Sequence, residues 1–116
     1  MRTIIQNGTV VTESAVFAAD VLVENGVIQA VGKKLDARGA QCIDAAGKYV
    51  LPGGVDVHTH MDLQAGAHRA VDDFYTGTVA AACGGTTTIV DFAPQEKDVP
   101  LLDAIRRQAA KAEHTS

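Results

Sequence analysis

The sequence predicts an α/β chain in two parts: a small all-β module over residues 1–51 and a β-α-β-α segment over residues 52–116. The first part contains short β-branched runs separated by turn signals, which is typical of hairpins. After a Pro-Gly-Gly break at residues 52–54, strand-like and helix-like patterns alternate. Such alternation is typical of parallel strands joined by helices, and the prediction of an α/β fold depends on it.

The all-β module is predicted from three turns. Asn25-Gly26 separates residues 20–24 from residues 27–31 and is the strongest hairpin signal in the chain. We expect residues 3–12 to form two short strands around a second Asn-Gly turn, and residues 42–51 to form a third hairpin. The module is therefore an incomplete sandwich of short antiparallel strands.

In the second part, residues 55–60 are predicted as a strand and residues 61–71 as a loop. Asp72 or Asp73 is suited to cap a helix that runs to about Cys83, where Gly84-Gly85 ends it. Residues 86–92 are continuously apolar or β-branched, which predicts a parallel strand buried on both faces.

A second helix is predicted after residue 97, with Asp98 as its N-cap and Pro100 in its first turn. Apolar residues then recur at helical spacing and predict a face that packs on a core. These residues are Leu101, Leu102, Ile105, Ala109 and Ala112.

The candidate functional residues are His58 and His60, one residue apart at the end of a predicted strand. Strand side chains alternate between faces, so the two imidazoles point the same way. Two neutral imidazoles on a stiff backbone suit a metal such as zinc. Asp56 lies on the same face and either orients a ligand imidazole or ends in a local turn. The alternative for the pair is two unrelated polar residues at a strand end.

Three motifs carry a resemblance to a known family: residues 52–60, residues 72–78 (DDFYTGT) and residues 83–92 (CGGTTTIVDF). Together they resemble the hydantoinase/dihydropyrimidinase family, the cyclic amidases of the amidohydrolase superfamily. The resemblance extends from Met1 to Phe92 and less distinctively to the end of the chain. The loop over residues 61–71 looks closest to D-phenylhydantoinase-like members.

The resemblance implies a metal-dependent-hydrolase TIM barrel, of which residues 52–116 would supply the first two β/α units. A TIM barrel needs ~250 residues. We therefore expect this chain to be the N-terminal portion of a longer protein, truncated within the barrel. In the family, strands from the C-terminal end of the protein complete the all-β module.

The resemblance also implies a binuclear zinc centre with His58 and His60 as ligands of one ion. A bridging carboxylated lysine, two more histidines and the catalytic aspartate are expected downstream, so no catalytic residue is assigned within this stretch. The implied reaction opens the ring of a hydantoin or 5,6-dihydropyrimidine to an N-carbamoyl amino acid. These 116 residues alone are expected to be inactive, and the full-length protein is expected to form a homotetramer.

Several other residues are candidates for roles near the metal. Leu63 and Ala65 lie where the family places a gate over the substrate, and a mobile surface loop is the alternative. Asp91 is expected to cap a turn or to act behind the ligands. Asp62 stands where the related dihydroorotases carry an arginine, which disfavours a carboxylate-bearing pyrimidine. His68 is expected to be solvated, and His114, near the chain end, to lie at the surface.

The composition of the chain limits the classes of molecule that it is expected to bind. A net charge of −4 without a basic cluster argues against nucleic-acid binding, and no apolar run approaches the ~18 residues of a membrane span. Cys42 and Cys83 are isolated and are interpreted as small buried residues of a reduced, cytoplasmic protein. The expected partner is a small cyclic amide.

Two rival interpretations remain. The chain could belong to the non-enzymatic dihydropyrimidinase-related scaffold proteins, although these have lost the metal ligands and His58 and His60 are present. It could also be complete as it stands, either as a truncated relic or as an independent β module with an attached β-α-β-α tail. That interpretation leaves hydrophobic strand edges unpaired, which favours aggregation.

Overall fold

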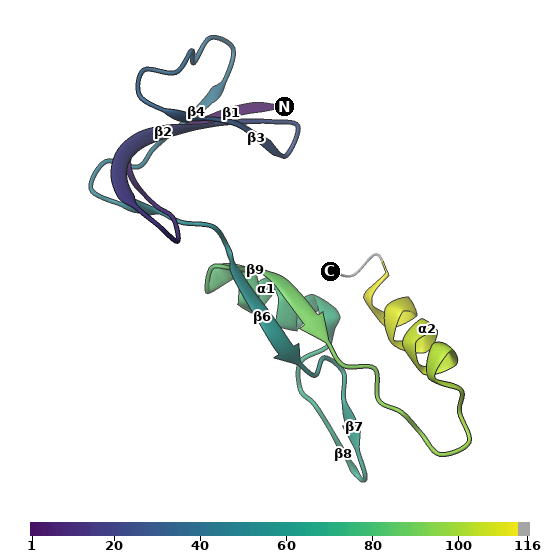
Figure 1. The fold of residues 1–116 in the computed structure, drawn as a ribbon. Helices are drawn as coiled ribbons and strands as arrows, with labels where there is room; N and C mark the ends of the chain where they lie inside the picture. The colour runs from purple at the N-terminus through teal and green to yellow at the C-terminus, as the bar shows by residue number, and fades with distance from the viewer. Residues whose placement is uncertain (114–116) are drawn as a thin grey trace. The chain divides into compact units, whose positions relative to one another are not determined.

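The structure, a computed structural model, describes residues 1–113. These residues divide into two compact units, Met1–Pro52 and a second unit that begins at Gly53 (Figure 1). The architecture is mixed α/β: the first unit consists of strands, and the second contains strands and both helices. None of the helices within residues 1–113 is long and apolar enough to cross a membrane.

The first unit is one five-stranded sheet built around a long central strand. Three strands run antiparallel in the order β3-β2-β1, and two more pair with β1 in parallel. Their bounds are β1 Arg2–Val11, β2 Val16–Glu24, β3 Val27–Gly32, β4 Gln41–Asp44 and β5 Tyr49–Val50. The core lies between β1 and β2, where Val10, Ala19 and Val21 form a buried cluster.

The Asn25-Gly26 turn is confirmed, whereas the predicted turn at Asn7 is wrong. Asn25 and Gly26 have φ angles of 50° and 79°, and the flanking residues of β2 and β3 pair directly. Asn7 also has a positive φ, 65°, but it forms a bulge within the continuous strand β1. Its backbone N–H donates to Asp20 (3.1 Å) and its side-chain amide to Asp44 (2.9 Å), so neighbouring strands stabilise the bulge.

The third predicted hairpin is also wrong, because β4 and β5 do not pair with each other. Asp44 accepts a hydrogen bond from the Ala46 N–H (3.1 Å), and Gly47 has a φ of 73°. After this turn the chain keeps its direction, and β5 pairs in parallel with a later part of the same β1 edge that β4 pairs with. The strands at this edge are therefore parallel to β1, and the expectation of an entirely antiparallel module was incorrect.

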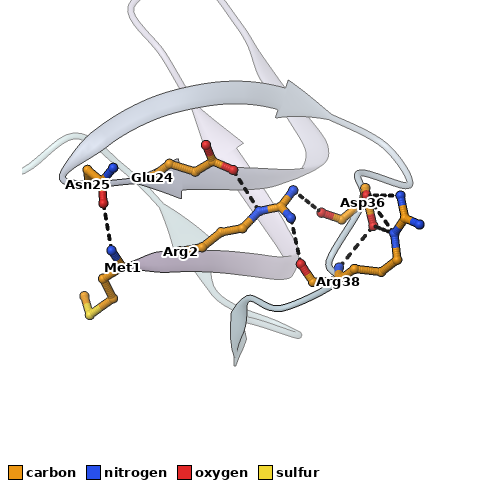
Figure 2. Close-up of polar contacts among 6 residues, drawn as sticks. All are labelled: Met1, Arg2, Glu24, Asn25, Asp36 and Arg38. Atoms are coloured by element: carbon orange, nitrogen blue, oxygen red, sulfur yellow. Dashed lines mark hydrogen bonds and ion pairs between the residues drawn. The ribbon is translucent and has the colours of Figure 1, made fainter.

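Arg2 attaches the start of β1 to the connection between β3 and β4 (Figure 2). Its Nε lies 2.8 Å from a carboxylate oxygen of Glu24 on β2. Its two terminal nitrogens donate to the backbone carbonyls of Arg38 (2.7 Å) and Asp36 (3.0 Å). The Asp36 carboxylate in turn holds the Arg38 guanidinium, and this hydrogen bond lowers the pKa of Asp36.

The second unit has the predicted β-α-β-α order with one addition. Strands β6 Gly54–Thr59 and β9 Thr86–Asp91 are parallel, with helix α1 Phe74–Cys83 between them in sequence and α2 Leu101–Ala112 after them. The segment predicted as a loop contains a small antiparallel ribbon, β7 Gln64–Ala65 and β8 His68–Arg69. Residues 60–63 connect the end of β6 to this ribbon.

The helix termini follow the predictions at α1 but not at α2. Asp73 caps α1 in a reciprocal capping box with Thr76, and Gly84 is the C-cap. Asp98 does not cap α2: it has a φ of 65°, and the N-cap is Pro100, which makes no side-chain cap hydrogen bond. The residue before a proline is disfavoured in helical geometry, so the helix begins after Pro100 rather than at Asp98.

Burial in the second unit is lower than predicted. Val57 and Val90 are 67% and 51% exposed, because the β6–β9 sheet has only two strands within residues 1–113. On α2 the buried residues are Ala104 and Gln108. Of the predicted apolar face, Leu102 is exposed and the other residues line an open groove beside β9. Cys42 and Cys83 are free but exposed, so the prediction that they are buried was wrong.

Candidate metal centre

The two candidate ligands lie together at the carboxyl end of β6. His58 belongs to the strand and His60 follows its last residue, Thr59. The imidazole ring centres are 5.1 Å apart and the rings are inclined at 66°. The side chains thus share one face, as the period-two alternation of a strand requires, and both residues are exposed.

The spacing of the two rings fits a shared metal ion. Two imidazoles on one tetrahedral ion have ring centres about 5 Å apart, given metal–nitrogen bonds of about 2 Å. Within residues 1–113, no group of three or more His, Cys, Asp or Glu side chains is placed to hold a metal. His58 and His60 therefore fit part of a metal site, and the described residues do not supply a third ligand.

Phe92, directly after β9, packs against both histidines. Its ring centre lies 4.6 Å from that of His58 and 5.0 Å from that of His60, and it stacks on His60 with an interplanar angle of 29°. The sequence reasoning assigned no role to Phe92. Its position at the carboxyl end of a strand parallel to β6 was the available signal, because parallel strands end on the same side of a sheet.

The Asp56 carboxylate makes a local contact. It accepts a hydrogen bond from the backbone N–H of His58 at 3.1 Å. This geometry corresponds to the local turn that was one of the two alternatives for this residue. It stiffens the backbone between Asp56 and His58 at the end of the strand.

Asp91 lies at the centre of a partly buried hydrogen-bond network that includes the residues on either side of His60. Its Oδ1 accepts from the Thr59 hydroxyl (2.9 Å) and from the backbone N–H of Met61 (2.8 Å). Its Oδ2 accepts from the side-chain amide of Gln108 on α2 (2.7 Å). Thr59 and Gln108 are each only 8% exposed, so they are the buried polar residues in the part of this unit that the structure describes.

Ion pairs of Asp62 hold the β7–β8 ribbon in place. The Asp62 carboxylate pairs with Arg69 on β8 and with Lys111 near the end of α2. The hydrogen bond from Arg69, and secondly that from Lys111, hold the pKa of Asp62 below its usual range. Because two cationic side chains balance its negative charge, the Asp62 carboxylate is suited to holding the ribbon in place and not to acting as a catalytic group.

The gate candidates lie on and beside this ribbon. Leu63 is half-buried, and its carbonyl accepts from the Ala70 N–H at 2.8 Å. Ala65 is exposed on β7, opposite His68 in the register of the two strands. His68 is exposed, as predicted. His114 lies outside the described residues.

Comparisons with known proteins place the chain in a family. The family model described as "Amidohydrolase family" matches residues 41–113. A D-hydantoinase of Geobacillus stearothermophilus is 49% identical over 97% of this chain, and a dihydropyrimidinase of Rattus norvegicus is 48% identical over 89%. A crystal structure of a D-hydantoinase superimposes on the whole chain with a TM-score of 0.96 at 46% identity.

The chain spans about a quarter of the length of each of these proteins: 24% of the first, 21% of the second and 25% of the crystallised chain. The matched residues include the histidine pair, the Asp91 network and α2. The resemblance inferred from the three motifs is thereby confirmed. The chain belongs to the amidohydrolase family, and its relatives are hydantoinases and dihydropyrimidinases.

Proposed function

We propose that this chain is part of a metal-dependent hydrolase that opens the cyclic amide ring of hydantoins or 5,6-dihydropyrimidines to N-carbamoyl amino acids. The observation that carries the proposal is the same-face pair His58 and His60, with ring centres 5.1 Å apart. The names of the relatives, D-hydantoinase and dihydropyrimidinase, support the substrate class. They do not favour the non-enzymatic scaffold or the relic.

In this proposal His58 and His60 hold one ion of a binuclear zinc centre. A bound metal supplies Lewis acidity towards the ring amide carbonyl. The chain's own contribution is to present two imidazoles on a stiff strand end, with the Asp56 carboxylate engaged by the strand backbone and Phe92 against the rings. Leu63 and Ala65, beside the histidines in sequence, are proposed to contact the substituent of the substrate ring.

The remaining ligands, including a bridging lysine, and the catalytic aspartate are proposed to lie in the rest of a TIM barrel that residues 52–116 begin. The exposed apolar faces of β6 and β9 support this, because the barrel strands of such a domain are covered on both sides. Residues 1–51 are proposed as part of a sandwich-like module. Without the other ligands, the 116 residues alone are expected not to catalyse ring opening.

The proposal also covers the cellular location and the oligomeric state of the whole protein. A cytoplasmic location is proposed, supported by the two free cysteines. A homotetramer is proposed on the resemblance to the hydantoinase family alone.

The test measures the rate at which the protein, purified as it occurs in its own cell, opens the rings of dihydrouracil and hydantoin. The metal content is measured on the same sample. His58→Ala and His60→Ala should each lower the bound metal and abolish turnover. His68→Ala is the matched control for metal content, since His68 is exposed on the ribbon and is not proposed as a ligand. Turnover that survives loss of either strand-end histidine would contradict the proposal.

A further inference from the structure

Asp91 accepts hydrogen bonds from the residue before His60 and from the residue after it. The carboxylate oxygen Oδ1 accepts from the side chain of Thr59, which precedes His60, and from the backbone of Met61, which follows it (2.9 and 2.8 Å). The Thr59 carbonyl also accepts from the backbone N–H of Phe92 at 3.1 Å. The backbone that carries His60 is therefore tied to the end of β9 at two adjacent points.

Gln108 fixes the orientation of the carboxylate. Its side-chain amide donates to Asp91 Oδ2 at 2.7 Å and to the carbonyl of Met61 at 3.1 Å. Gln108 is buried, so these bonds form away from solvent, where an unsatisfied amide is costly. The two side chains together satisfy both the N–H and the C=O of Met61.

We infer that Asp91, oriented by Gln108, is a positioning residue that fixes the backbone of His60 so that both strand-end imidazoles bind one metal ion. This inference rests on the proposed function. In this assignment Asp91 does not touch the metal or the substrate: its carboxylate accepts three hydrogen bonds, from Thr59, Met61 and Gln108. It acts on the geometry of the ligand pair.

The test measures the zinc affinity of the metal-free, full-length protein by competition with a chromophoric chelator. Asp91→Ala removes the acceptor of three hydrogen bonds and should weaken zinc binding about 10- to 100-fold. Asp91→Asn keeps one carbonyl oxygen for Thr59 and Met61, so its affinity should fall less. At saturating zinc both variants should regain turnover close to that of the wild type.

Asp103→Asn is the control, because Asp103 lies on the same helix as Gln108 but pairs with Arg106 instead. A purely structural role would lower the unfolding midpoint of the Asp91 variants and leave zinc affinity unchanged, and that result would overturn the inference. If Asp91→Ala does not fold, an Asp91→Asn protein with wild-type zinc affinity would overturn it equally. A wild-type protein that binds no zinc would overturn the proposed function and this inference together, whereas normal zinc binding in wild type and variants would overturn the inference alone.

Discussion

Replacing Gly53 with alanine is expected to loosen the pairing of β6 with β9. A Cβ at position 53 would overlap the Oγ1 and Cγ2 atoms of Thr87 and lie 2.7 Å from its Cβ. Thr87 is β-branched and sits within β9, so its side chain has few rotamers with which to move away. The strand that carries the histidines must then shift away from its neighbour.

The expected magnitude is that of adding one methyl group where there is no room for it. Inserting a methyl group into a packed contact costs about 1–3 kcal/mol. The Gly54 N–H donates to the Gly85 carbonyl at 2.8 Å beside this contact, and its hydrogen exchange reports opening of the ladder there. Gly53→Ala should therefore accelerate exchange of the Gly54 amide about 5- to 150-fold in the protein.

Two further variants test the reasoning. Gly32→Ala is the control, because the nearest atom to a Cβ at that position is Leu35 Cδ2 at an ordinary 3.7 Å. Adding Thr87→Ala to Gly53→Ala removes the overlaps with Oγ1 and Cγ2 but leaves the 2.7 Å contact with Cβ, so it should restore only part of the protection. Less than a twofold change in Gly54 exchange, or no rescue by the second substitution, would refute the steric argument.

The remaining predictions concern two carboxylates whose pKa values are lowered in the folded protein, Asp62 chiefly by Arg69 and Asp73 chiefly by the backbone N–H of Thr76. A depressed pKa stabilises the fold above the unfolded value of about 3.9, and this stability is lost as pH falls through the folded pKa. Asp62→Asn should lower the protection of the Ala70 amide at neutral pH and remove its dependence on pH below about 4; an unchanged pH profile would show that the ion pair does not fix the ribbon. Asp73→Ala should accelerate exchange of the Thr76 amide, and equal rates in wild type and variant would contradict the capping role.

Local sequence signals predicted much of the second unit. The alternation in residues 55–60 placed both imidazoles on one face, and Asp73 capped the expected helix. These features depend on residues no more than four positions apart, so a local sequence pattern is enough to predict them.

Features that depend on distant partners were not predicted. Asn7-Gly8 has the same composition as the real turn at Asn25-Gly26, but Asp20 and Asp44 convert it into a bulge from other strands. Gln108 falls between apolar residues of α2, and nothing in the helical pattern indicates that it reaches Asp91, 17 residues away. Asp91 was expected to cap a turn or to act behind the ligands, but the partners that define its environment come from two distant segments, residues 59–61 and helix α2.

The most direct test of the central claim is anomalous diffraction at the zinc edge from crystals of the protein purified as it occurs in its own cell. The account predicts an anomalous peak about 2.0–2.1 Å from one nitrogen of each imidazole of His58 and His60. Metal peaks only at other positions, or metal-free histidines in a preparation that opens the ring, would contradict it.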